Sequence, residues 1–306
     1  TDEEALVDVL RLSRGMTYKA AISGLNLGGG KAVIIGDPAK LKNEAFMRRF
    51  GRFVDSLGGR YITAEDVNMK TRDMEYVHME TDSVTGIPES MGGSGDPSPV
   101  TAYGVYMGMK ATAHHVFGSD NLSEKSVVVQ GVGQVGMYLV DHLTKEGAKV
   151  YITDIAEEKL AKVAKSSGAE VVGLDDIYDL DVDIYSPCAL GATLNDNTIP
   201  RLKASIIAGG ANNQLKEERK HGYMLIDRGI TYAPDFLINA GGLINVGAEY
   251  YGPYNREKAH LDAEKIYDTT LDILKMATDE SISTQEAAIM IAERRIASIG
   301  NIKLPY

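Results

Sequence analysis

The sequence predicts an α/β protein of two domains. Three features carry this prediction: a length of 306 residues, an alternation of short apolar runs with helical patterns after residue 99, and a stretch rich in glycine and proline at 86–99. At about 150 residues per domain, the length suits two domains. Strands that alternate with helices form a parallel sheet with right-handed crossovers. The glycine- and proline-rich stretch can continue neither a helix nor a central strand, so we expect it to link the domains.

The first domain is expected to be a mixed layer of helices and short strands. Residues 1–15 have an amphipathic pattern, with Thr1 placed to cap the helix and Gly15 placed to end it. A glycine-rich loop follows this helix and leads into an apolar run. The further expected elements are a buried strand at 31–35, a helix at 41–57 and a strand at 60–63.

The second domain is expected to alternate regularly between strands and helices. Its expected helices are 99–117, 133–146 and 156–166. Its expected strands are Ser126–Gln130, Lys149–Thr153, Glu170–Val172, Asp183–Tyr185 and Ser205–Ala208. The last 50 residues have a helical pattern, and Ser283 with Glu286 is spaced as a capping box.

Composition and charge exclude several classes of protein. Hydrophobic residues make up 44% and charged residues 25%, values that exclude a disordered chain. The net charge of −11 repels phosphate backbones, so no nucleic-acid partner is expected. No apolar run approaches the ~18 residues of a membrane span, so no membrane partner is expected. The single cysteine, Cys188, excludes an internal disulfide and fits a cytoplasmic protein. No cluster has metal-ligand spacing, so no metal is expected.

A strand that runs into a glycine pattern and then a helix predicts a dinucleotide site of the Rossmann type. The residues of the pattern are Gly131, Val132, Gly133, Gln134, Val135 and Gly136. Gly131 permits a tight turn, Gly133 lets the backbone approach a pyrophosphate, and Gly136 lets the helix lie close to the strand. The pyrophosphate would bind at the helix N-terminus, where N–H groups and the dipole favour an anion. Ordinary turns share such a pattern, so the glycines alone leave the site open.

A carboxylate after the next strand strengthens this prediction. Asp154 follows the strand Lys149–Thr153 and lies 23 residues after Gly131. At that spacing a carboxylate binds the ribose hydroxyls and repels a 2′-phosphate. We therefore expect NAD rather than NADP. The alternative for Asp154 is a solvated strand end.

Three charged residues in the first domain suggest chemistry on a small charged substrate. Lys31 follows the glycines 28–30, but the residues around it do not match a phosphate-binding P-loop. A lysine at a strand start beside such backbone is suited to proton transfer, and the alternative is that it extends into solvent. Lys19 adds a second positive charge, and Asp66 adds a carboxylate.

Several blocks of the sequence are recognisable. They are Met16–Lys19, Gly24–Lys31, Tyr61–Val67, Asp96–Gly104, Pro187–Gly191, Ala211–Leu215 and Ile238–Gly242. In this order, and over essentially the whole chain, they resemble the glutamate/leucine/phenylalanine/valine dehydrogenase family, and they look most like its leucine enzymes. The resemblance implies a catalytic and oligomerisation domain at 1–95, with about 283–306 returning to it, and a Rossmann-type, doubly wound NAD-binding domain at 96–282.

The resemblance implies reversible oxidative deamination of a branched-chain L-amino acid to its 2-oxo acid and ammonia, with NAD as cofactor. The substrate would be L-leucine, with valine and isoleucine also accepted. Lys19 would bind the substrate carboxylate, Lys31 would orient the attacking water, and Asp66 would carry protons to and from the amino group. The chemistry agrees, because hydride leaves Cα only when the amine is neutral, which requires a base. The alternatives are a phenylalanine- or valine-preferring enzyme, or a truncated, non-catalytic NAD-binding relative.

The resemblance also implies binding residues by position. Substrate-binding positions are Met16, Lys19, Ala64, Asn213, Leu243 and Val246, and cofactor-binding positions beyond the glycine pattern are Thr101, Asp154, Cys188, Ala189 and Asn212. The apolar pocket positions argue against glutamate, whose side-chain carboxylate would be buried unpaired. At Cys188 the family uses the backbone, so the side chain is expected to be a small apolar group. Asn68 stands where the family commonly has glycine.

Two further expectations follow from the resemblance. The family's chains usually begin some dozens of residues earlier, so the first domain is expected to lack its N-terminal part. A homo-oligomer is expected, commonly an octamer among the leucine enzymes.

Overall fold

The computed structural model describes residues 1–66, 68–189 and 191–300. Its contacts divide the chain into two compact units, which we describe separately. The first unit comprises Thr1–Pro97 and Gly242–His260, and the second comprises Ser98–Gly241 and the chain from Leu261 onward. The break after residue 97 falls inside the stretch 86–99.

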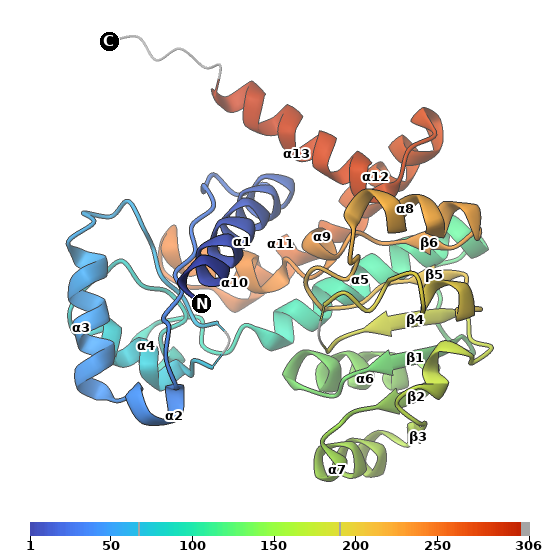
Figure 1. Cartoon of the computed structure of the whole chain (residues 1–306), viewed down its shortest axis with the longest axis horizontal. Coiled ribbons are helices and arrows are strands. Elements are labelled where there is room, and N and C mark those ends of the chain that lie inside the picture. The colour runs from blue at the N-terminus through green and yellow to red at the C-terminus, as the bar shows by residue number, and fades with distance from the viewer. Residues whose placement is uncertain (67, 190, 301–306) are drawn as a thin grey trace. The chain divides into compact units, whose positions relative to one another are not determined.

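The second unit contains a six-stranded parallel sheet. Its strands are β1 (Ser126–Gln130), β2 (Lys149–Thr153), β3 (Glu170–Val171), β4 (Ile184–Pro187), β5 (Ile206–Ile207) and β6 (Thr231–Tyr232). They lie side by side in the order β3-β2-β1-β4-β5-β6, and every neighbouring pair is parallel (Figure 1). This order is that of a doubly wound dinucleotide-binding sheet, in which the order of the strands reverses beside β1. The predicted fold class is therefore confirmed.

The sheet is buried on both faces. Val127, Val128 and Val129 of β1 are all fully buried, which is expected of a parallel strand covered by helices on either side. On the face of Val128, a cluster includes Tyr185 of β4 and Leu225 of α8. The helices that lie wholly in this unit are α5 (Ser98–Phe117), α6 (Gln134–Glu146), α7 (Glu157–Ser167), α8 (Glu218–Asp227), α9 (Asp235–Ile238), α12 (Ile266–Glu280) and α13 (Thr284–Gly300), with short 3-10 turns η2 (Asp176–Tyr178) and η3 (Ile199–Arg201).

Helix α13 differs from its expected place in the first domain. It belongs to the second unit, where it packs against α12 and α8. Tyr223 of α8 donates its hydroxyl proton to Glu286 of α13 over 2.9 Å. At the start of α13, Ser283 Oγ accepts the Glu286 N–H at 3.2 Å, one of the two bonds of the predicted capping box. The segment that joins the first unit is instead 242–260. The expected return of 301–306 lies outside the described residues.

The first unit is mostly helical. Its elements are α1 (Asp2–Ile22), α2 (Pro38–Leu41), α3 (Glu44–Asp55), α4 (Thr71–His78) and the 3-10 turn η1 (Glu89–Met91). Helices α10 (Gly241–Tyr250) and α11 (Arg256–Glu264) begin or end at its boundary. Its buried cluster joins Met47 of α3 to Met74 and Val77 of α4, with Val84 and Ile87 beside them.

The two strands predicted in the first unit were wrong. Residues 31–35 have no regular structure, and Val33 and Ile35 are 46% and 60% exposed. Within the described residues, the segment 60–63 contributes only a parallel bridge from Thr63 to Val84. A strand needs a hydrogen-bonded neighbour, which an apolar run cannot supply by itself.

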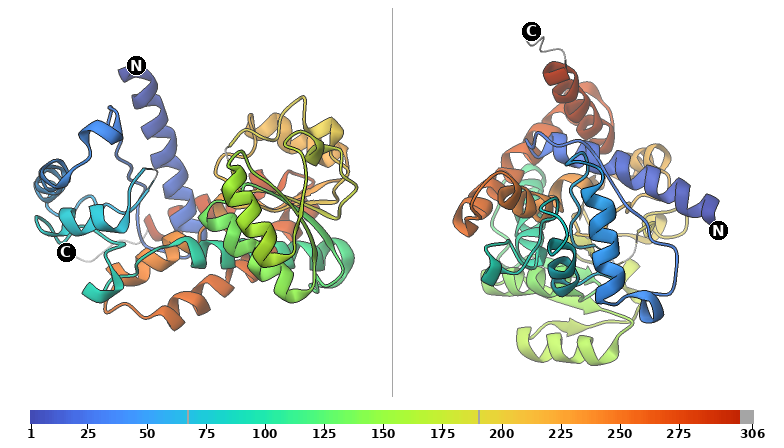
Figure 2. Two further views of the ribbon diagram at one scale, coloured as in Figure 1. Left: turned by 90° about the horizontal axis from the view of Figure 1, so that it is seen from below. Right: turned by 90° about the vertical axis from the view of Figure 1, so that its left-hand side faces the viewer.

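Helix α1 is longer than predicted. Thr1 caps it as expected, with Oγ accepting the Glu4 N–H at 3.3 Å. The helix passes through Gly15 and ends at Ile22, and Figure 2 shows it as one continuous rod. A glycine inside a helix costs about 1 kcal/mol. The burial of Ala20, Ala21 and Ile22 in the last turn offsets that cost.

Among the helices of the described residues, none has both the length and the apolar character needed to cross a membrane.

Candidate active site

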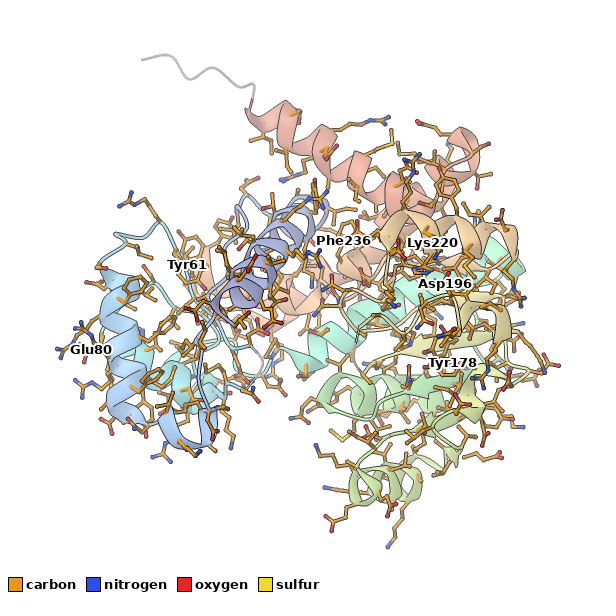
Figure 3. The ribbon with its side chains drawn as sticks, in the orientation of Figure 1. Tyr61, Glu80, Tyr178, Asp196, Lys220 and Phe236 are labelled. Atoms are coloured by element: carbon orange, nitrogen blue, oxygen red, sulfur yellow. The ribbon has the colours of Figure 1, made fainter. Side chains whose placement is uncertain are left out.

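Two glycines bring the Lys31 segment close to its neighbours in the first unit. A Cβ on Gly29 would lie 2.0 Å from the carbonyl oxygen of Ser13 and 2.2 Å from the hydroxyl of Thr17, both on α1. A Cβ on Gly30 would lie 2.9 Å from the ring of Tyr61, which is labelled in Figure 3. The two residues before Lys31 are therefore in close contact with α1 on one side and with the segment that leads to Asp66 on the other.

Lys31 and Asp66 form an ion pair through Nζ and Oδ2. The lysine side chain is 23% exposed and the carboxylate side chain 47%, so the pair is partly shielded and still accessible to a small molecule. The two residues are 35 positions apart in the sequence. An amine beside a carboxylate supplies both a donor and an acceptor for proton transfer.

Helix α1 carries two of the predicted substrate residues. Met16 and Lys19 are three residues apart and thus lie on neighbouring positions of one helix face. Both are half-buried. Lys19 is in the last turn, one helical turn beyond the contact between α1 and Gly29.

The other predicted substrate-binding residues also lie in the first unit, except Asn213. Ala64 precedes Asp66, and Leu243 and Val246 lie on α10. All three are half-buried. Asn213 lies in the second unit, where its φ of 52° places it in the left-handed region.

The glycine pattern of the second unit forms a turn between β1 and α6. Gly131 has a φ of 98°, and its N–H donates to the Thr153 carbonyl of β2 at 2.8 Å. A Cβ on Gly136 would lie 2.0 Å from the Gly131 carbonyl oxygen, so only glycine permits this close packing. A Cβ on Gly133 would meet no atom within 4 Å. Gly133 is also the N-cap of α6, whose first N–H groups receive no side-chain cap.

Asp154 fastens this turn to the end of β2. Its Oδ2 accepts the Val132 N–H at 2.7 Å, and its Oδ1 accepts the Ala156 N–H at 2.8 Å. The alternative of a purely solvated strand end is therefore wrong. Each oxygen keeps a second lone pair, so the carboxylate can accept ribose hydroxyls while it holds the loop.

Cys188 is half-buried at the same edge of the sheet. Its N–H donates to the Gln130 carbonyl at 2.7 Å, and its Sγ accepts the Gly210 N–H at 3.3 Å. Burial raises the pKa of the Cys188 thiol, which disfavours the reactive thiolate. A nucleophilic role is thus disfavoured, and the small apolar role of its side chain stays a prediction.

The other predicted cofactor residues lie in the second unit as well. A Cβ on Gly131 would lie 2.8 Å from the Ala189 Cβ, so Ala189 backs the glycine turn. Asn212 Oδ1 accepts a hydrogen bond from Asn239 Nδ2 at 2.8 Å. Thr101 lies in the first turn of α5. A tight glycine turn, open space above Gly133, an uncapped helix start and a carboxylate at β2 together fit a dinucleotide.

One cluster with metal-ligand character was not evident from sequence spacing. Ligand atoms of Asp196, Glu217 and His221 lie within 4.8 Å of one another. However, His221 Nδ1 accepts the Glu217 N–H at 2.8 Å, so a neutral ring carries its proton on Nε2, which then has no lone pair for a metal. Lys220 Nζ also lies 2.7 Å from Asp196, and the two are neighbours in Figure 3. The cluster is therefore better explained as a set of contacts that hold the first turn of α8.

Comparisons with known proteins identify the family. The family description "Glu/Leu/Phe/Val dehydrogenase, dimerisation domain" matches residues 1–83, and "Glutamate/Leucine/Phenylalanine/Valine dehydrogenase" matches 92–156 and 151–302. The leucine dehydrogenase of Bacillus cereus is 55% identical over 306 residues, which is 100% of this chain and 83% of that protein. The leucine dehydrogenase of Thermoactinomyces intermedius is 57% identical over 296 residues, covering 97% of this chain and 80% of that protein.

A solved structure agrees with these relatives. The crystal structure of L-tryptophan dehydrogenase from Nostoc punctiforme has a TM-score of 0.84 and 46% sequence identity, and the match covers 99% of this chain and 86% of that chain. The motif resemblance found in the sequence is thus confirmed over nearly the whole length. The chain belongs to the glutamate/leucine/phenylalanine/valine dehydrogenase family.

Proposed function

We propose that the protein catalyses the reversible, NAD-dependent oxidative deamination of L-leucine and related branched-chain amino acids to 2-oxo acids and ammonia. The observation that carries this proposal is the Lys31–Asp66 ion pair, held by Gly29 and Gly30 against the helix that bears Lys19. The similarity to leucine dehydrogenases at 55–57% identity supports the choice of substrate. A module that only binds nucleotide has no need of these three charged groups.

Each charged residue has a distinct task in this reaction. The Lys19 ammonium would pair with the substrate carboxylate and so orient Cα. Asp66 would take a proton from the substrate ammonium, because only a neutral amine can push electrons toward Cα as the hydride leaves. Lys31 would hold the water that attacks the imine carbon and would stabilise the charge that develops there. When bound, NAD supplies the hydride acceptor.

The second unit would hold NAD by its backbone and one carboxylate. The N–H groups at the start of α6 would meet the pyrophosphate, and Gly133 leaves the space for its approach. Asp154 would accept the ribose hydroxyls. A 2′-phosphate would bring two negative charges against the same carboxylate, so NADP would bind less well.

Two alanine substitutions test this cofactor site without relying on activity. Gly133→Ala adds a methyl group that meets no protein atom within 4 Å, so the melting temperature of the cofactor-free protein should change by no more than about 2 °C. The same methyl occupies the space of the pyrophosphate, so the Kd for NADH, measured by fluorescence titration, should rise at least about tenfold. Gly136→Ala places a Cβ 2.0 Å from a carbonyl oxygen, so it should lower the melting temperature itself. Normal NADH affinity in Gly133→Ala would refute this placement of the pyrophosphate.

The proposed pocket favours aliphatic side chains. Ala64, Leu243 and Val246 offer no partner for a side-chain carboxylate, which would be costly to bury alone. One methylene in an apolar pocket changes discrimination by only ~1–3 kcal/mol, so leucine, isoleucine and valine should overlap as substrates.

A substrate and cofactor panel tests the proposed function directly. NADH formation at alkaline pH is measured with L-leucine, L-valine, L-phenylalanine and L-glutamate, and the leucine reaction is repeated with NADP. We expect the highest kcat/KM for leucine, valine within about 100-fold of it, and no measurable rate with glutamate. A higher value for phenylalanine would overturn the substrate, and faster turnover with NADP would overturn the role of Asp154. Tight NADH binding without turnover of any amino acid would indicate a non-catalytic relative.

The proposal extends to assembly and setting. We propose a homo-oligomer, as an octamer, because the description matched at residues 1–83 is a dimerisation domain and the first unit exposes large apolar side chains. These side chains include Leu6 and Leu10 of α1 and Phe53 of α3. A cytoplasmic setting is proposed because the chain has one cysteine, which is a free, half-buried thiol.

A further inference from the structure

The last turn of α10 carries a carboxylate that binds backbone groups of a distant loop. Glu249 Oε2 accepts the N–H of Gly86 at 2.9 Å and the N–H of Ser94 at 2.7 Å. Its Oε1 accepts the N–H of Ile87 over a longer distance of 3.5 Å. The buried Asn245, one turn earlier, donates from Nδ2 to the Ser94 carbonyl at 3.5 Å. Both ends of the loop 86–94 are therefore attached to one face of α10, within the first unit.

The proposed pocket residues of α10 lie at different angles from Glu249 around the helix. At 3.6 residues per turn, Leu243 and Gly247 share a face that lies about 120–160° around α10 from Asn245 and Glu249. Val246 lies three residues before Glu249, about 60° from it, and so beside it on the helix surface. The face of Leu243 and Gly247 packs against the segment between Lys19 and Lys31. A Cβ on Gly247 would lie 3.3 Å from both methyl carbons of Leu25, which is closer than ordinary van der Waals contact.

These two contacts define the rotation of α10 about its own axis. The face that meets Leu25 does so through Gly247, which has no side chain to interlock with its neighbour. The hydrogen bonds of Glu249 resist such a rotation, because an N–H···O bond weakens steeply once its donor angle is lost. At a Cα radius of 2.3 Å, a rotation of about 20° moves each backbone position by about 0.8 Å and its side chain by more. Such a shift matters for a pocket that distinguishes side chains by one or two methylenes.

We propose that Glu249 is a positioning residue for substrate preference. By holding α10 in one rotation against the loop 86–94, it keeps Leu243 and Val246 at the positions that accept a branched aliphatic side chain. The inference rests on the proposed function, because it concerns the pocket of that reaction. Glu249 acts through α10, since both of its oxygens accept backbone N–H groups of the loop 86–94.

The test compares substrate preference among variants of the full-length chain. Glu249→Ala removes the acceptor and should lower kcat/KM for L-leucine about tenfold, mainly through KM, and lower the leucine-to-phenylalanine ratio at least about fivefold. Glu249→Gln keeps an oxygen for Gly86 and Ser94, so the ratio should stay within about twofold of the original protein. Glu257→Ala, an exposed glutamate on α11, is the matched control and should change neither value. The KM for NAD should be unchanged in all three, because the proposed cofactor residues lie in the second unit.

Several outcomes would overturn the inference. If Glu249→Ala slows leucine and phenylalanine equally, Glu249 stabilises the fold without setting preference. If Glu249→Ala does not fold, Glu249→Asp shortens the acceptor by one methylene, and an unchanged substrate ratio in that variant rejects the proposal. Failure of the proposed function looks different, because the original chain would then oxidise neither amino acid. In that case hydrogen exchange still tests whether Glu249 holds the loop 86–94 against α10. The amides of Gly86 and Ser94 should exchange faster in Glu249→Ala than in Glu257→Ala, and equal exchange rates would reject this attachment.

Discussion

Lys31→Ala should abolish amino-acid deamination while leaving NADH binding nearly intact. The lysine pairs with Asp66, and its loss removes the group that holds the attacking water together with the positive charge beside the reacting carbon. Proton transfer and charge stabilisation each contribute on the order of 10²–10⁴ in rate, so kcat should fall at least about 10³-fold. The nucleotide turn belongs to the second unit, so the Kd for NADH should stay within about twofold of the original protein.

A matched lysine separates this role from a general effect of charge. Lys40 is an exposed lysine of α2 whose only described ion pair is a surface contact with Asp37 at 3.3 Å. Lys40→Ala removes the same charge from the same unit and should retain full kcat, since such surface pairs contribute little. Steady-state rates with L-leucine and NADH titrations are measured on both variants. A Lys31→Ala protein with kcat within about threefold of the Lys40→Ala protein would refute the catalytic role.

The sequence predicted the second unit well because its signals are local. The apolar runs of β1 and β2 are bounded by turns, and both strands have the predicted ends. The glycine pattern of 131–136 marks the turn and the start of α6 within six residues. The strand β6 escaped prediction because Thr231 and Tyr232 form a pair too short to show a period, and only pairing with β5 defines it.

The first unit was harder to predict because its stability depends on distant partners. Helix α4 has a polar sequence and was missed. Its first turn is held by Asp73, whose carboxylate accepts from Lys42 at 2.7 Å across 31 positions of the chain. Conversely, the apolar run at 31–35 looks like a buried strand and is largely exposed. The spacing of apolar residues shows which face of a segment can be buried. It does not show whether a neighbouring segment is present to cover that face.

In the candidate site too, short motifs could be located from the sequence, whereas contacts between distant segments could not. Lys31 and Asp66 belong to motifs that the family resemblance could locate, although only the structure brings their side chains together. Glu249 belongs to no such motif, and its hydrogen bond to Gly86 spans 163 positions. A carboxylate whose partners are backbone N–H groups leaves no pattern in the partner sequence, since any residue except proline supplies that donor.

The neighbouring glycines Gly28 and Gly29 should respond in opposite ways to substitution by alanine. Gly28→Ala adds a methyl group that meets no atom within 4 Å, so its activity and melting temperature should match those of the original protein. Gly29→Ala places the same methyl group 2.0 Å from the Ser13 carbonyl oxygen, and 2.5 Å from the Thr17 backbone nitrogen. Neither glycine has a φ in the left-handed region, so the two changes differ in contact and not in backbone strain.

Gly29→Ala should damage catalysis more than stability. Besides the Thr17 hydroxyl, two backbone atoms of α1 are in its way, and because these cannot rotate aside, the loop itself must move away from the helix by about 1 Å or more. A displacement of that size at a catalytic group costs about 10²-fold in rate, and we expect this loss in kcat/KM for L-leucine. Overpacking costs about 1–3 kcal/mol of stability, so the melting temperature should fall by several degrees with the protein still folded at 25 °C. If Gly29→Ala retained the activity of Gly28→Ala, the contact with α1 would not position Lys31. Gly29→Ala displaces the Lys31 side chain but keeps it, whereas Lys31→Ala removes it. Gly29→Ala should therefore remain measurably more active than Lys31→Ala.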